Sequence, residues 1–150
     1  MRERFQMSRA SSQIRAVARR LIAHETAGHK SSAAKTAAIF PVAEKLRPHL
    51  VMLMGNGGFR ALLSRALALA NAEVLWLRAV HVKADGSMEG SEELQTQIDP
   101  DDFMEGGVAL LAELLGLLVA FIGVSLTVRL LRDVWPTVPL NDSDFAKGQK

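Results

Sequence analysis

The 150-residue sequence contains no cysteine and no tyrosine, and only six phenylalanines and two tryptophans. The absence of cysteine excludes disulfides and thiol catalysis, and it is typical of a protein from a reducing compartment. The apolar residues are therefore mostly Leu, Ala and Val, of which Leu and Ala favour helix. With 49% apolar and 23% charged residues, the composition is that of a globular protein and excludes a mostly disordered chain.

Charge is unevenly distributed along the chain, although the net charge is only +2. Residues 1–83 contain 14 Lys/Arg and 4 Asp/Glu, a net charge of +10, whereas residues 84–150 contain 4 Lys/Arg and 12 Asp/Glu, a net charge of −8. Such opposite charges pair within the folded chain or between two copies of it. The basic part lacks interleaved aromatic residues and a nucleic-acid-reading motif, so nucleic acid is not expected as a partner.

Apolar residues at helical spacing predict two helices in the first part of the chain. Ser11 caps the first, whose apolar stripe covers 14–22. The second is expected over 41–54, with a kink or break at Pro48 because proline lacks the N–H that an α-helix needs. The glycine-rich stretch 55–58 is expected to end it.

The clearest amphipathic helix is predicted over 59–77, with its end near Val80. Residues 81–83 are predicted to form a short extended segment, and residues 91–98 one short acidic helix or loop.

The run Val108–Val128, VALLAELLGLLVAFIGVSLTV, holds 21 residues and one charge, Glu113. It is predicted to lie in a helix that begins at Asp99-Pro100 and continues to Trp135. About 20 apolar residues also suffice to cross a bilayer, so a membrane span is the alternative. The other amphipathic helices need an apolar partner, and this favours a buried core helix in a cytoplasmic protein over a membrane location.

The sequence therefore predicts a single all-α domain over 11–140, a bundle of four to five helices around the long apolar C-terminal helix. A flexible basic N-terminus over 1–10 and a flexible polar tail over 141–150 are expected to flank it.

Small residues recur along one side of the apolar run and predict a contact surface for a second helix. They are Ala112, Gly116, Ala120 and Gly123. Small side chains let two helix backbones approach closely, in a membrane or in a soluble bundle. We expect this stripe to serve self-association or binding of another helical protein.

The stretch Gly55-Asn56-Gly57-Gly58-Phe59-Arg60 partly matches a dinucleotide fingerprint, with Arg60 in place of the last glycine. A glycine turn that leads into a helix exposes backbone N–H groups, so Gly57, Gly58 and Arg60 form a candidate site for an anion or phosphate ligand. The favoured interpretation is structural: a helix end followed by a tight turn.

The motif His24-Glu25-Thr26-Ala27-Gly28-His29 resembles the zinc-protease signature but fails on spacing. Two histidines must stand at i and i+4 to face one metal, and here they stand at i and i+5. We expect no metal, no cofactor and no catalytic residues.

The segments GFRALLSRALALA, LRAVHVKADGSMEG and LLGLLVAFIGVSLTVRLLRDVWP resemble those of small bacterial helical proteins with no assigned activity. The resemblance covers about a third of the chain and implies no functional residue. The expected function is that of a non-catalytic helical interaction or structural module that self-associates. The alternatives are a single-span membrane protein anchored by 108–128 and a phosphate-ligand binder at Gly57, Gly58 and Arg60.

Overall fold

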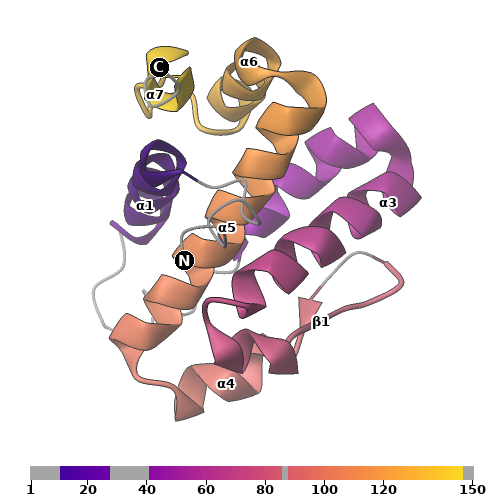
Figure 1. Ribbon diagram of the computed structural model, residues 1–150, viewed down its shortest axis with the longest axis vertical. Coiled ribbons are helices and arrows are strands. Elements are labelled where there is room, and N and C mark those ends of the chain that lie inside the picture. Colours follow the sequence, from indigo (N-terminus) through magenta and orange to yellow (C-terminus); the bar gives the residue numbers. More distant parts are fainter. Residues whose placement is uncertain (1–10, 28–40, 86–87, 147–150) are drawn as a thin grey trace, which may run out of the picture.

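The computed structural model describes residues 11–27, 41–85 and 88–146, and this part of the chain is all-α apart from one short hairpin. The elements are α1 (Ser12–Thr26), α3 (Pro41–Asn71), the 3-10 helix η2 (Leu75–Ala79), β1 (His81–Val82), β2 (Met88–Glu89), α4 (Ser91–Gln97), α5 (Pro100–Ile122), α6 (Val124–Val134) and α7 (Ser143–Ala146). Figure 1 shows α5 through the middle of the molecule, between α1 and the two arms of α3. The predicted all-α class with a long apolar helix is confirmed.

Helix α5 begins where the sequence predicts. The side chain of Asp99 accepts a hydrogen bond of 3.1 Å from the backbone N–H of Asp101, and Pro100 occupies the first helical position. Asp101 and Asp102 add negative charge beside the positive end of the helix dipole. Every residue from 106 to 118 is buried. The helix is therefore enclosed over about three turns.

The expected continuation of this helix to Trp135 is wrong, because the chain turns at Gly123. Its φ of 91° lies in the left-handed region that favours glycine, and its N–H bonds to the carbonyl of Val119 at 2.9 Å. Helix α6 then starts in a new direction (Figure 1) and ends at Val134. The apolar run 108–128 is thus divided between two helices.

The turn in α3 lies at Gly55 and not at Pro48. The backbone at Pro48 remains helical, whereas Gly55 has a φ of 79° and a ψ of 165°. We call residues 41–54 the first arm and 56–71 the second arm; they run back along each other in Figure 1. Gly57 and Gly58 belong to the second arm, so Gly55 alone of these glycines ends the first arm.

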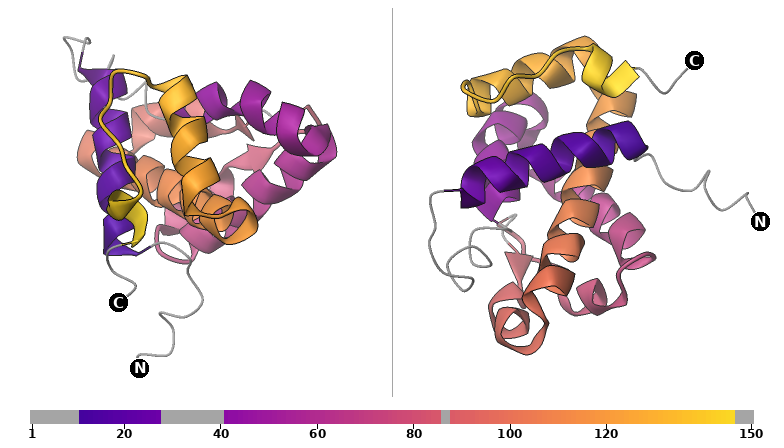
Figure 2. Two further views of the ribbon diagram at one scale, coloured as in Figure 1. Left: turned by 90° about the horizontal axis from the view of Figure 1, so that it is seen from above. Right: turned by 90° about the vertical axis from the view of Figure 1, so that its left-hand side faces the viewer.

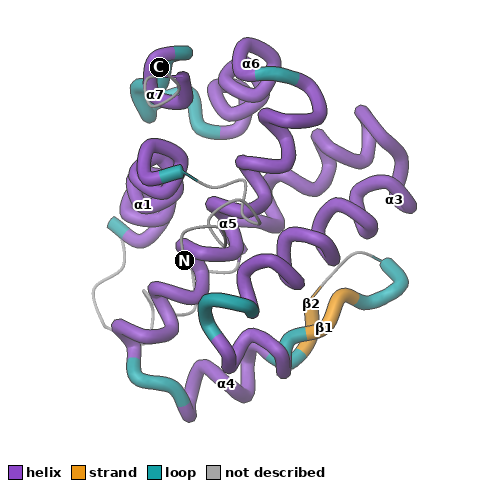
Figure 3. The backbone as a smooth tube through the Cα atoms, viewed as in Figure 1, coloured by secondary structure: helices purple, strands orange, loops and turns teal. Residues whose placement is uncertain are grey.

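The second arm ends at Asn71, before the expected limit near Val80. The N–H groups of Glu73 and Val74 both bond to the carbonyl of Ala70, and the chain continues as η2. Residues 81–82 then form the predicted extended segment and pair antiparallel with β2, as Figure 3 shows.

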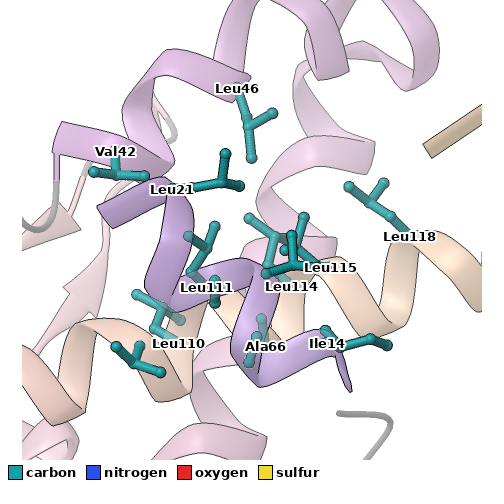
Figure 4. Close-up of a cluster of buried hydrophobic side chains, with 14 of the residues drawn as sticks. Ile14, Leu21, Val42, Leu46, Ala66, Leu110, Leu111, Leu114, Leu115 and Leu118 are labelled. Carbon is teal, nitrogen blue, oxygen red and sulfur yellow. The ribbon is translucent and has the colours of Figure 1, made fainter. Parts of the chain in front are cut away.

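The core lies where α1, α3 and α5 meet. In Figure 2 (right), α1 crosses over α5, and Figure 4 shows the side chains between them pointing toward one another. The core residues labelled in Figure 4 are Ile14, Leu21, Val42, Leu46, Ala66, Leu110, Leu111, Leu114, Leu115 and Leu118. The predicted stripe of α1 is confirmed, since Ile14, Val17 and Leu21 are all buried.

Residues 141–146 differ from the expected flexible tail. They form a turn and α7, with Phe145 buried to 2% exposure. Arg20 of α1 holds this segment through the carbonyl of Pro139 at 2.9 Å and through Asp144 at 3.4 Å. The expected flexible segments 1–10 and 147–150 lie outside the described residues.

One carboxylate, Glu113, is fully buried in the apolar helix α5. Arg15 of α1 lies 3.9 Å from its Oε2 and also donates to both oxygens of Glu73 at 2.6 Å. The guanidinium therefore links two carboxylates, one inside the core and one half-exposed. It brings cationic charge to a group whose burial costs several kcal/mol in the absence of compensation.

We expect Arg15→Met to lower the free energy of unfolding by about 3 kcal/mol, because it removes this cation from a buried carboxylate. The double variant Arg15→Met/Glu113→Met should recover most of the loss, since no buried charge remains. Urea unfolding followed by circular dichroism measures both. Equal destabilisation of the single and double variants would contradict this role of Arg15.

Gly106 of α5 allows the ring of Trp76 to pack directly on the helix backbone. A Cβ added at Gly106 would lie 2.3 Å from the indole Cζ2. The indole also stacks on Phe103, with centroids 5.2 Å apart and planes 8° from parallel. Because the ring is rigid and is also held by its stacking on Phe103, it has little room to shift.

Gly106→Ala is therefore expected to destabilise the protein by about 1–3 kcal/mol through overpacking. Gly57→Ala is the matched control, because a Cβ there meets nothing within 4 Å. It should be neutral or stabilise slightly, since alanine favours helix over glycine. Thermal unfolding of the two variants provides the comparison, and equal stability would contradict the packing argument.

Candidate functional site

The candidate site is an apolar groove of about 540 Å³ between the first arm of α3 and α6. It is lined by Pro48, His49, Met52 and Leu53 from α3, by Ile122 from α5, and by Leu126, Arg129, Leu130 and Asp133 from α6. Figure 1 shows the two elements that supply most of these residues, α6 and the first arm of α3, in the upper part of the molecule.

Large apolar side chains beside this groove are exposed to solvent. Met52 is 85% exposed, Leu53 53% and Leu126 49%, and Phe121 next to the groove residue Ile122 is 65% exposed. Single exposed apolar residues are ordinary, whereas a cluster of them marks a binding surface. We call Met52, Leu53 and Leu126, together with the groove they line, the apolar face.

The turn at Gly123 helps to create this face. It ends α5 just after Phe121 and Ile122 and sets α6 beside the first arm of α3. Helix α6 buries Thr127, Val128 and Leu131 against the core and leaves Leu126 outward.

Two opposite charges stand at the rim of the groove, one turn apart on α6. Arg129 and Asp133 are both exposed, and neither pairs with another residue in the part of the chain that the structure describes. The apolar face therefore carries one positive and one negative group that remain available to a partner.

Half of the small-residue stripe is buried within the protein itself. Ala112 and Gly116 are buried by the surrounding helices. Ala120 is exposed and Gly123 is half-buried, so only this end of the predicted stripe reaches the surface. It adjoins the apolar face.

The candidate anion residues lie at the start of the second arm of α3. A hollow of about 310 Å³ borders Gly57 and Arg60 but not Gly58. The Arg60 guanidinium reaches the carbonyl of Ala84 at 3.4 Å, which the Asn56 side chain also approaches at 3.5 Å. Arg60 therefore contacts the 81–85 segment, and the anion site stays a prediction.

Glu25 joins three separate segments. Its Oε2 accepts a hydrogen bond of 2.7 Å from the Trp135 indole N–H and pairs with Lys45 at 2.5 Å. Burial raises the pKa of Glu25, but the hydrogen bonds from Lys45 and Trp135 outweigh it and leave the pKa lowered. His24 lies 3.5 Å from the hydroxyl of Thr137, and His29 lies outside the described residues.

Hydrogen bonds to carboxylates in the acidic part of the chain lower two further pKa values. The hydrogen bond from Arg19 lowers the pKa of the Glu105 carboxyl. The backbone N–H of Asn141 lowers the pKa of Asp144, and Arg20 acts in the same direction. Some of the opposite charges of the two parts thus pair with each other within the folded chain.

No family model, no curated protein and no solved structure matches this chain. Among residues 11–27, 41–85 and 88–146, no group of three or more metal-binding side chains lies together.

Acid is expected to destabilise the protein through Glu25, Glu105 and Asp144. Their pKa values are lower in the folded chain than the ordinary 4.5 for Glu and 3.8 for Asp. Their stabilising contribution is therefore present above those values and is lost as pH falls through the lower folded values. The free energy of unfolding in urea, measured at pH 7, 5, 4 and 3, should decline below about pH 4.5.

Glu25→Gln should lose less stability than the wild type between pH 5 and pH 3. Glu89→Gln, at an exposed position on β2, is the control and should keep the full acid-dependent loss. An unchanged pH profile for Glu25→Gln would contradict this role of Glu25.

Proposed function

We propose that this protein is a non-catalytic helical interaction module that self-associates through the apolar face. The observation that carries the proposal is that the exposed side chains of Met52, Leu53 and Leu126 line one groove. Large apolar side chains in a shared concavity are typical of the anchors of protein interfaces.

Both the apolar area and the mixed charge support a second copy as the partner. Full burial of one Leu, Met or Phe side chain is worth about 1.5–3 kcal/mol, whereas association costs about 4–15 kcal/mol in lost freedom. One anchor is therefore insufficient, but three anchors from each of two copies are of the required order. Arg129 and Asp133 give the face both signs of charge, which a self-complementary surface needs.

The alternative function is that of a membrane protein with α5 as its span. Among the described residues, α5 alone is long and apolar enough to cross a bilayer. However, 72% of its apolar window is buried by the rest of the chain, and Glu113 lies in its middle. A helix already covered by its neighbours favours a core role, and we propose a cytoplasmic location for this reason.

Leu126→Ser is expected to weaken self-association at least tenfold, because it removes an anchor of the apolar face. Leu75→Ser is the matched control: Leu75 is also a large exposed residue, at 62%, but lies on η2 and outside the groove. Sedimentation equilibrium over a range of concentrations measures both dissociation constants.

Two results would overturn the proposal. One is a wild-type protein that stays monomeric at millimolar concentration. The other is recovery of the expressed protein only in the membrane fraction, from which carbonate does not extract it. That result would support the single-span alternative.

A further inference from the structure

We infer that α6 is the docking helix, and that two copies pack with their α6 helices antiparallel about a two-fold axis, with Arg129 of each facing Asp133 of the other. This inference rests on the proposed self-association and specifies its geometry.

The outward side of α6 has the residue pattern that helix–helix docking requires. Leu126, Arg129, Leu130 and Asp133 follow one another at intervals of three, one and three residues and all line the groove, so they share one side of the helix. The opposite side is occupied, because Val128 and Leu131 are buried in the core. Residues 140–142 cover a further part of α6 through hydrogen bonds to Ser125 and Arg132. The side with Leu126, Arg129 and Asp133 stays exposed.

The order of charges selects the relative direction of the two helices. A parallel pair in register would place Arg129 against Arg129 and Asp133 against Asp133, which is repulsive. An antiparallel pair brings Arg129 of each copy to Asp133 of the other, so both contacts are attractive. Such a reciprocal arrangement is the defining property of a two-fold interface.

The apolar residues fit the same arrangement. Leu130 is half-buried against the core of its own chain. It stands between Arg129 and Asp133 in the sequence, so its exposed part lies beside the two-fold axis and meets its counterpart there. Leu126 lies one helical turn before Leu130. It extends the apolar contact toward Met52 and Leu53, which line the other side of the groove. Burial of these side chains supplies affinity, and the two charge pairs supply direction and register.

Charge reversal provides a direct test by sedimentation equilibrium. Arg129→Asp alone and Asp133→Arg alone should each weaken homodimerisation at least tenfold, because each places like charges in both reciprocal contacts. An equimolar mixture of the two variants should form a heterodimer close to wild-type affinity, since every contact in it joins opposite charges. The double variant Arg129→Asp/Asp133→Arg should also form a homodimer.

Arg78→Asp is the matched control, an exposed arginine on η2 that does not line the groove. It should keep wild-type affinity, and circular dichroism should show native helicity in every variant. If the wild type dimerises but the single reversals do not weaken it, or the mixture fails to restore it, the antiparallel α6 geometry is wrong while self-association stands. A monomeric wild type would instead overturn the proposed function.

Discussion

Helix α5 is buried around its whole circumference between 106 and 118, and covering it determines the positions of the other elements. Helix α1 covers one side and the arms of α3 another, as Figures 1 and 2 show. An amphipathic helix gains most of its stability from burial of its apolar stripe, so α1 and α3 depend on α5 as much as α5 depends on them. The buried carboxylate of Glu113 also constrains the position of α1, because Arg15 of α1 must lie close to it in the folded core.

Local signals predicted the beginnings of helices well. The Asp99-Pro100 start and the Ser11 cap depend on neighbouring residues, and the structure confirms both. Changes of direction were predicted less well. The glycine-rich stretch 55–58 was expected to end a helix and does so at Gly55, whereas the kink expected at Pro48 is absent. The turn at Gly123 was not expected, because Gly123 interrupts an apolar run with no change of composition. Which glycine adopts a positive φ depends on what the next helix packs against.

The candidate site was harder to predict than the fold, because the first arm of α3 and α6 are far apart in the sequence. The small-residue stripe drew attention to Ala112 and Gly116, but helices of the same chain fill that space. A usable signal was present in the consecutive apolar residues 51–54 and in the apolar residues on both sides of α6. A helix that is apolar on two faces buries one in its own core and leaves the other for a partner.

The contacts of α1 also constrain when the chain can fold during synthesis. Arg20 bonds to Pro139 and Asp144, and Glu25 to Trp135, so the first helix is completed by residues made near the end. Roughly a hundred residues separate the end of α1 at Thr26 from the end of α5 at Ile122. At about 5–20 residues per second, α1 waits on the order of 5–20 s for its apolar stripe to be covered. During this interval the apolar stripe of α1 is therefore exposed to solvent, because the helix that covers it has not yet been made.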